Sequence, residues 1–240
     1  NFGPKLGLSA TPERENEFGG SDETDRMFDF FSGSKKSGIV HEFTLEDALN
    51  HEPPVLSKYI YDIQFLYLSD DESEEYGKIS AKISKMYAIN KKLDHKDTNL
   101  RRLLTQRSDI LKKAESKIPL AREIIFNNFK KDNSKWIVYC DDNDQLNRVD
   151  NEIREIAKKI NFQIFKFTAE EIPMNERKDT LKDFENMGGI ILSCYMLDEG
   201  IDIPSVSSGL LLASSQSKRE FIQRRGRVLR RDPKDFIDRK

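Results

Sequence analysis

The 240-residue chain is long enough for one large domain or two small ones, and 37% hydrophobic residues are ample for a buried core. Its 40 Lys and Arg residues nearly balance 42 Asp and Glu residues, which excludes a bulk electrostatic attraction to nucleic acid and leaves only local anion sites. Two cysteines, three scattered histidines and the lack of a membrane-length apolar run favour a reduced, cytoplasmic protein without a metal site or membrane contact.

The N-terminal quarter of the chain contains few regular elements. An apolar run at residues 6–10 predicts a buried strand, and the Gly- and Ser-rich stretch after it predicts a loop with one turn of helix around 27–31. Thr44 is placed to cap a helix, with Asp47 three residues later, and the proline pair at 53–54 ends that helix. We therefore place a domain boundary after residue 54.

The next stretch changes from a strand pattern to a helical pattern. Residues 59–68, "YIYDIQFLYL", are rich in aromatic and β-branched residues and predict a strand in the core. Residues 70–129 show helical spacing of apolar residues over two or three elements. The charged part of this stretch, about 70–116, is interpreted as a solvated helical insertion, with contact to a partner or a nucleic-acid duplex as the alternative.

The C-terminal half alternates short apolar runs with helix-like segments. This alternation predicts an α/β fold with a parallel sheet covered by helices on both faces. The runs lie at 136–140, 162–167, 189–194 and 209–213.

Polar and specific residues follow the last two of these runs. In an open parallel sheet, ligands gather at the carboxyl ends of the strands, so these residues are candidates for a binding site. In "YMLDEGIDIPSV", Gly200 permits close approach of the backbone and Asp202 offers an acceptor for a hydroxyl group.

The segment 223–231, "QRRGRVLRR", holds five arginines in nine residues. Arg224, Arg227 and Arg230 are three residues apart and share one face if the helix continues past Gly226. Guanidinium groups are permanently charged and match phosphate oxygens, so the segment suits a transferring phosphoryl group. A solvated basic face or a simple nucleic-acid patch is the alternative interpretation.

Several segments, in order along the chain, resemble the motifs of superfamily two helicases and translocases. "LGLSATPER" resembles motif III, "WIVYC" motif IV, "CYMLDEGIDIP" motif V and "QRRGRVLR" motif VI, while "FTAEEIPMNERKDTLKDF" resembles the segment after motif IV. The resemblance is nearest to the branch with the XPB-type DNA repair helicases and the restriction-enzyme translocases. Cys194 is a departure, because many members carry Thr or Ser there.

This resemblance implies an arrangement of RecA-like domains. Residues 1–54 correspond to the tail of a first, ATP-binding RecA-like domain and a linker. Residues 55–240 correspond to the second RecA-like domain, the helicase C-terminal domain, with the insertion at about 70–116. The family's Walker A loop and DExH box precede motif III, so we expect them before Asn1. The chain is then a fragment that does not hydrolyse ATP alone, and ATP and Mg²⁺ are held mainly by the upstream domain.

The resemblance also implies roles for individual residues. Residues expected at the nucleotide come from motifs V and VI: Gly200, Asp202, Gln223 and Arg224 for ATP binding, and Arg227 and Arg230 as catalytic arginine fingers. Residues expected to couple hydrolysis to strand movement come from motif III: Ser9, Ala10 and Thr11. Residues expected on the nucleic-acid track lie at strand ends: Tyr139, Cys140, Thr168 and Cys194.

The sequence therefore predicts the second motor half of an ATP-dependent nucleic-acid helicase or translocase, with DNA favoured over RNA as the polymer. A non-catalytic, degenerate RecA-like module for nucleic-acid binding or assembly is the alternative. Intact Walker A and DExH residues upstream would favour the motor. A nuclease or methylase partner or fused domain, as found in restriction enzymes, would lie outside this chain.

Overall fold

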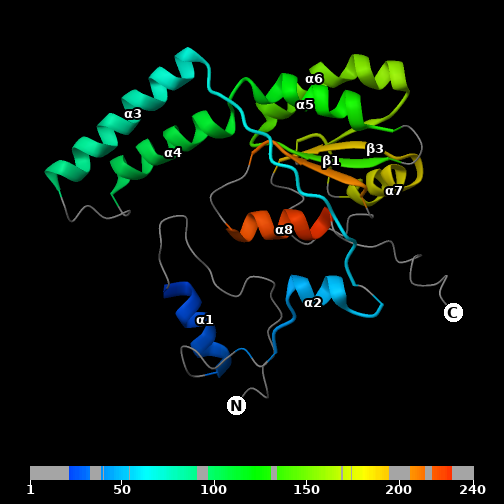
Figure 1. Cartoon of the computed structure of the whole chain (residues 1–240), viewed down its shortest axis with the longest axis horizontal. Coiled ribbons are helices and arrows are strands. Elements are labelled where there is room, and N and C mark those ends of the chain that lie inside the picture. The colour runs from blue at the N-terminus through cyan, green and yellow to red at the C-terminus, as the bar shows by residue number, and fades with distance from the viewer. Residues whose placement is uncertain are drawn as a thin grey trace. The chain divides into compact units, whose positions relative to one another are not determined.

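The computed structural model describes residues 22–32, 39, 41–53, 55–90, 97–130, 134–168, 170–173, 175–194, 206–213 and 218–228. The chain forms two compact units, one of Asn1–Ile60 with Ser215–Lys240 and one of Tyr61–Ser214 (Figure 1). The strand predicted at 6–10 lies outside the described residues.

Three helices are described in the first unit: α1 (Asp22–Ser32), α2 (Leu45–Asn50) and α8 (Lys218–Val228). Helix α1 is eleven residues long, whereas the sequence predicted a single turn. Its sequence contains no Gly or Pro, and Met27 and Phe31 recur at helical spacing, so nothing local stops the helix after one turn.

The capping box predicted at the start of α2 is confirmed. The Thr44 hydroxyl accepts from the Asp47 backbone N–H at 3.1 Å, and the Asp47 carboxylate accepts from the Thr44 N–H at 2.8 Å. The Asp47 carboxylate also accepts from the Thr44 hydroxyl at 2.6 Å, and this bond, together with the one from the Thr44 N–H, lowers the pKa of Asp47. Helix α2 ends at Asn50, just before the prolines that were expected to stop it.

The second unit contains a four-stranded sheet in the order β2-β3-β1-β4, and every strand pair is parallel. The strands are β1 (Lys135–Tyr139), β2 (Ile164–Phe167), β3 (Gly189–Ser193) and β4 (Ser208–Leu211). The predicted α/β class and the four predicted strands are confirmed.

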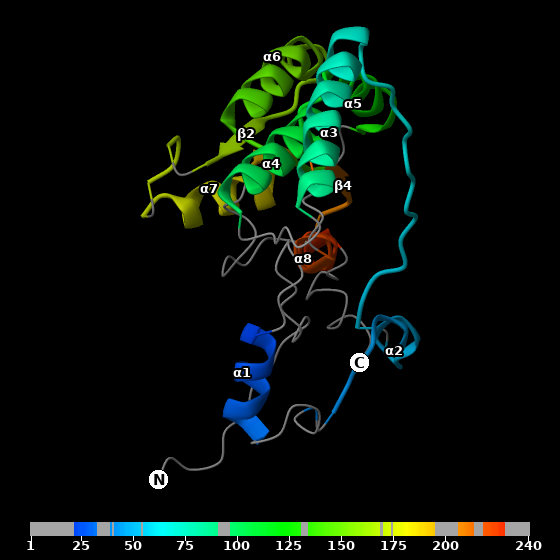
Figure 2. The ribbon, with the colours of Figure 1, turned by 90° about the vertical axis from the view of Figure 1, so that its left-hand side faces the viewer.

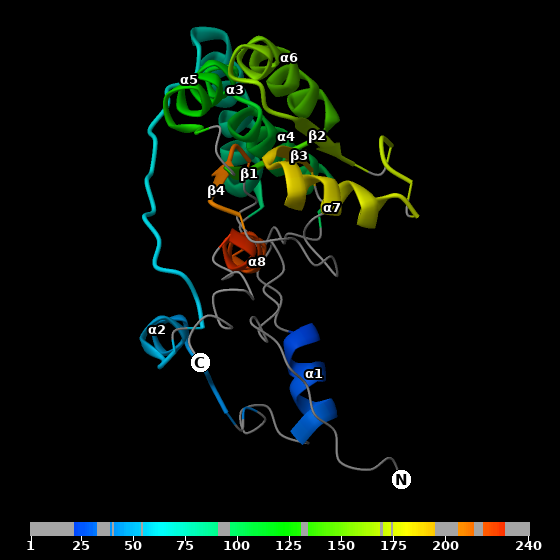
Figure 3. The ribbon, with the colours of Figure 1, turned by 90° about the vertical axis from the view of Figure 1, so that its right-hand side faces the viewer.

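Helices cover both faces of this sheet. Helices α5 (Lys117–Asn128) and α6 (Asn143–Ile160) lie on one face and α7 (Arg177–Met187) lies on the other (Figure 3). The core between α5, α6 and the sheet is built largely from Ile118, Ala121, Ile125, Trp136, Val138, Leu146, Val149, Ile153, Ile190 and Leu192. On the α7 face, Phe165 and Phe184 meet edge to face with ring centroids 5.7 Å apart.

Helices α3 (Asp70–Ile89) and α4 (Thr98–Lys112) lie side by side as a hairpin (Figures 1 and 2). They enclose a small apolar core of their own, whose buried members are Ile79, Ile83, Leu100 and Leu103. Together with α5, these helices confirm the helical spacing predicted across 70–129.

The prediction of a core strand at 59–68 is wrong. The segment is extended but belongs to no strand, and its side chains are exposed: Ile60 to 97%, Phe65 to 88% and Tyr67 to 90%. A strand is stabilised by hydrogen bonds to a neighbouring strand. None of the described strands pairs with this segment. The aromatic and β-branched residues of segment 59–68 were therefore not sufficient to form a strand.

Candidate functional site

The carboxyl ends of the four parallel strands lie along one edge of the sheet, which we call the strand-end edge. Tyr139 ends β1 and Cys140 follows it, Thr168 follows β2, and Cys194 follows β3. The register aligns the last residues of these strands, and the Cys140 N–H donates to the Ser193 carbonyl at 2.8 Å. The structure thus brings together the four residues predicted for the nucleic-acid track.

All four of these side chains are buried, with at most 7% of any residue exposed. The Thr168 hydroxyl accepts from the Glu171 N–H at 3.3 Å, and its carbonyl accepts from the Ile172 N–H at 3.1 Å, so Thr168 organises the turn after β2. That these residues contact nucleic acid stays a prediction, and their burial limits such contact to backbone groups or to a surface that they support from beneath.

Both cysteines are free, as the sequence indicated, and the structure shows that both are buried. The Cys194 thiol lies 3.0 Å from the Asn143 side-chain oxygen, to which it donates. Burial raises the pKa of Cys194 to about 11, and the negative charges of Asp142 and Glu170 add to this. Cys194 is therefore a protonated thiol at neutral pH, with little of the thiolate that reacts with electrophiles or metals.

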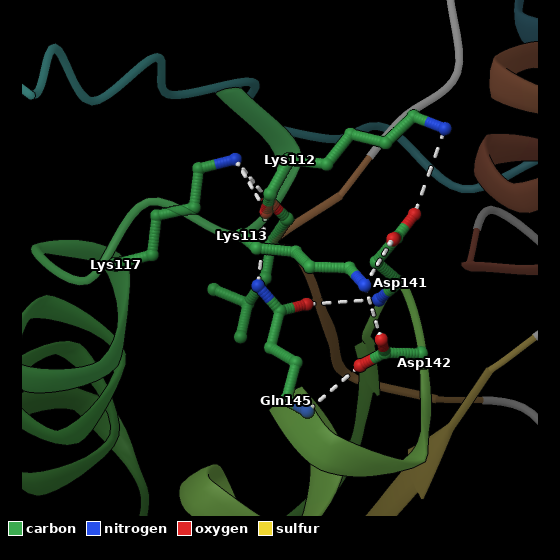
Figure 4. A network of polar contacts seen from close by, with 7 residues as sticks. Lys112, Lys113, Lys117, Asp141, Asp142 and Gln145 are labelled. Carbon is green, nitrogen blue, oxygen red and sulfur yellow. Dashed lines mark hydrogen bonds and ion pairs between the residues drawn. The ribbon is translucent and has the colours of Figure 1, made fainter. Parts of the chain in front are cut away.

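A polar cluster that the sequence did not reveal lies at the strand-end edge beside Cys140 (Figure 4). We call it the polar joint; its members are Lys112, Lys113, Lys117, Asp141, Asp142 and Gln145. The only signal in the sequence was the run of polar residues "DDNDQ" directly after the apolar run "WIVYC". The lysines come from a segment about 30 residues earlier, so their approach to this run could not be foreseen.

Within the joint, Asp142 caps α6 by accepting from the Gln145 N–H at 2.9 Å. The Gln145 side chain accepts from the Asp141 N–H at 2.8 Å and donates to the Lys112 carbonyl at 2.9 Å. The Lys113 ammonium pairs with the Asp142 carboxylate, and this contact raises the pKa of Lys113. Burial alone would raise the pKa of Asp142, but the hydrogen bond from Gln145 and the ion pair with Lys113 outweigh it and lower that pKa.

The arginine-rich segment forms much of α8 in the first unit. The helix runs through Gly226 to Val228, so the backbones of Arg224 and Arg227 share one helix. Arg224 is 2% exposed, and the Arg225 guanidinium lies 5.5 Å from the centroid of the Phe221 ring. Gln223 also lies on this helix.

Six predicted site residues lie outside the described part of the chain: Ser9, Ala10, Thr11, Gly200, Asp202 and Arg230. Among the described residues, no group of three or more His, Cys, Asp or Glu side chains is placed to hold a metal ion. No helix in the described ranges is long and apolar enough to cross a membrane.

Comparison with known families identifies the part of the chain that contains the sheet and α8. Residues 116–232 match the family model "Helicase conserved C-terminal domain". This segment is similar to the helicase C-terminal domains. The match begins just before α5, covers the whole sheet and extends into the arginine-rich segment. The predicted resemblance to the superfamily two helicases is thereby confirmed.

A curated relative is the DNA 3'-5' translocase XPB2 of Sulfurisphaera tokodaii, which is 27% identical over 97% of this chain and 51% of its own length. This match confirms the predicted resemblance to the XPB-like branch. The chain spans about half the length of that curated relative.

Two solved structures are also similar to the chain. The Hef helicase domain of Pyrococcus furiosus is 25% identical, with a TM-score of 0.38 over 68% of this chain and 32% of the other. A chain in the structure of the E. coli DEAD-box protein SrmB bound to the regulator of ribonuclease activity A (RraA) is 20% identical. Its TM-score is 0.38 over 48% of this chain and 67% of the other.

Proposed function

We propose that this chain is the second motor half of an ATP-dependent helicase or translocase that acts on nucleic acid, with DNA preferred over RNA. The observation that carries the proposal is the match of residues 116–232 to the helicase C-terminal domain family, which includes the whole arginine-rich segment. The relative named a DNA 3'-5' translocase matches almost the whole chain and supports DNA as the polymer.

The arginines of α8 fit the triphosphate of ATP by their chemistry. Guanidinium groups keep their charge and present a planar fork of donors to phosphate oxygens. We assign Gln223 and Arg224 to nucleotide binding, and Arg227 and Arg230 to the γ-phosphate as arginine fingers. Gly200 and Asp202 are assigned to the nucleotide and its ribose.

The remaining parts of the nucleotide site are assigned to an ATP-binding half. In this proposal that half supplies the Walker A loop and the DExH box, and it holds Mg²⁺ and most of the ATP. Ser9, Ala10 and Thr11 couple hydrolysis to movement of the polymer. The isolated chain is then inactive, and measurable ATP hydrolysis by the purified 240-residue chain would contradict the proposal.

The strand-end edge is assigned to the nucleic-acid track. Tyr139, Cys140, Thr168 and Cys194 are brought together there, and their burial suits residues that shape the surface from beneath. The phosphate backbone of the polymer then meets the turns that follow the strands. Backbone contacts of this kind position a polymer without reading its sequence.

The test is ATP hydrolysis by the full-length protein that carries this chain, measured with duplex DNA, single-stranded DNA and RNA. We expect one DNA form to stimulate turnover most. Arg227→Ala should lower the stimulated kcat by about 10³ to 10⁵-fold, while ATP binding is retained. Arg225→Ala is the matched control, because it removes a neighbouring arginine of α8 that stacks on Phe221 and is expected to change kcat only a few-fold.

Two results would redirect the proposal. If no polymer stimulates turnover and the Walker A and DExH residues are eroded, the chain belongs to a degenerate module that binds nucleic acid without hydrolysis. If turnover is stimulated but Arg227→Ala matches the parent protein, the arginine-rich segment is a binding surface and not a set of fingers.

A further inference from the structure

The α3–α4 hairpin and the sheet have separate apolar cores. The buried residues of the hairpin core, Ile79, Ile83, Leu100 and Leu103, include none of those that form the core beneath α5 and α6. Several described polar contacts fix the base of the hairpin to the rest of the second unit. Two hydrogen bonds hold the start of α3. The Glu115 N–H donates to the Glu72 carboxylate at 2.9 Å, and the Ser116 hydroxyl donates to the Tyr67 carbonyl at 3.0 Å.

The polar joint holds the second end at the base of the hairpin, which is the C-terminal end of α4. The Lys112 carbonyl, at the last residue of α4, accepts from the Gln145 side chain at 2.9 Å and from the Lys117 ammonium at 3.1 Å. The last carbonyls of a helix have no partner within the helix, so these contacts satisfy a group that would otherwise need water. Figure 4 shows Lys117 and Gln145 approaching this point from different elements.

Lys117 also reaches the end of β4. Its ammonium donates to the Leu212 carbonyl at 2.6 Å, directly after the last residue of that strand. A single side chain thus joins the end of α4, the first residue of α5 and the exit of β4. The chain continues from this exit to Lys218, where the arginine-bearing helix α8 begins.

The chemistry of Lys117 suits a fixed link more than a surface charge. An ammonium carries three donors, and two of them are committed to backbone carbonyls here. Burial lowers the pKa of Lys117, and the negative charge of Asp141 opposes that lowering. Both carbonyls belong to backbone that cannot change rotamer, so this link resists displacement of the exit of β4 relative to α4.

We propose that Lys117 is a positioning residue, which holds the exit of β4 against the end of α4 and so fixes where the chain leaves the sheet, ahead of the arginine-rich segment in the sequence. It acts through the Leu212 carbonyl and touches no nucleotide. This inference rests on the proposed function for its effect on turnover, whereas the link itself is independent of that function.

The first measurement is amide hydrogen exchange on the full-length protein, with Lys117→Met compared with the parent. Methionine has a similar length and no donors. We expect exchange at residues 112–114 and 212–213 to accelerate at least about tenfold, with β1 and β3 unchanged. Lys182→Met is the control, since Lys182 pairs with Asp179 on an exposed helix face, away from the polar joint. Unchanged exchange in Lys117→Met would overturn the link.

The second measurement separates positioning from folding. In the full-length protein, Lys117→Met should lower the polymer-stimulated kcat about 10 to 100-fold and leave the KM for ATP within about twofold, because misplacement by about 1 Å costs rate more than binding. Lys117→Arg should restore at least half of the rate, since a guanidinium can also donate to two carbonyls. A purely structural defect would instead lower the amount of folded enzyme. The enzyme that still folds would then keep the kcat and the KM of the parent protein.

The two proposals fail in different ways. If the parent protein shows no stimulated turnover, the proposed function fails and takes the catalytic effect of Lys117 with it, while the exchange result still decides the link. If the parent is stimulated and Lys117→Met has the same kcat despite faster exchange, the proposed function stands and the positioning role of Lys117 is overturned.

Discussion

Strand β3 and the segment 59–68 are both short apolar stretches with strand-forming composition, yet they end in opposite environments. All five residues of β3 are buried, and the strand is paired on both sides, with β1 and with β2. In the segment 59–68, Ile60, Phe65 and Tyr67 are almost fully exposed and no strand forms. The difference shows that an apolar run becomes a strand when neighbouring strands and covering helices are there to receive it.

The largest expected effect compares one isoleucine from each region. Ile191 is completely buried in β3, whereas Ile63 is 57% exposed. Ile191→Ala should lower the free energy of unfolding by about 2–5 kcal/mol, because it leaves a cavity in the core. Ile63→Ala should change it by no more than about 0.5 kcal/mol.

Urea unfolding followed by the fluorescence of Trp136 measures both variants. Trp136 is the single tryptophan of the chain and lies buried in β1, so its signal reports the sheet. Equal shifts of the two midpoints would mean that the segment 59–68 is packed in solution and that the contrast with β3 is lost.

The next effect concerns the glycine that starts β3. Gly189 has a φ of 119°, and a Cβ at this position would overlap the backbone carbonyl of Gln163. Gly189→Ala should therefore cost at least about 1–3 kcal/mol through backbone strain, with the steric clash adding to it. The close approach of the Gln163 backbone to the start of β3 therefore requires glycine at position 189.

Gly77→Ala on α3 is the matched control, because a Cβ there meets no atom within 4 Å. It should stabilise the hairpin by about 0.5–1 kcal/mol, since alanine is the better helix former. Differential scanning calorimetry of the two variants checks the pair of expectations. A Gly189→Ala protein as stable as the parent would show that β3 does not begin with this close approach.

The smallest effect is a pH dependence at the end of β1. The pKa of Asp142 is lowered in the folded protein, so its stabilising contribution is present above the ordinary aspartate pKa of about 4 and is lost as the pH falls through the lowered value. Asp142→Asn keeps an effective helix cap but removes the charge. It should therefore reduce stability at pH 7 by at most about 1 kcal/mol, after allowance for solvent screening, and by less at pH 3.

Urea unfolding at pH 7 and pH 3 measures this dependence. The parent protein, unfolded at the same two pH values, is the reference for each loss of stability. If Asp142→Asn lost the same stability at both pH values, the ion pair with Lys113 would not be the cause.

Local patterns were sufficient for much of the fold. The capping box of Thr44 and Asp47 depends on two residues three apart, and the four strands depend on apolar runs bounded by polar turns, so both could be predicted. The length of α1 was underestimated because surrounding Gly- and Ser-rich residues suggested a loop. The fate of residues 59–68 depends on distant partners, and no local pattern records those.

Local patterns were also sufficient to predict part of the candidate site. A residue directly after a strand of a parallel sheet lies at the strand-end edge, which is how Cys140, Thr168 and Cys194 were found. Their burial and the polar joint were not predicted. The contact between Lys117 and the carbonyl of Leu212 joins residues 95 positions apart. Its acceptor is a backbone carbonyl, which every residue carries, so the residue type at 212 could not indicate the contact.

The sequence by itself determined the class of the fold and the resemblance to helicases, because these depend on residue types at short spacings and on their order along the chain. Only the tertiary structure decided which apolar runs are buried, which strand ends are accessible and how the base of the hairpin is held. Those outcomes depend on which distant groups meet when the sheet closes, and on whether each backbone donor and acceptor then finds a partner.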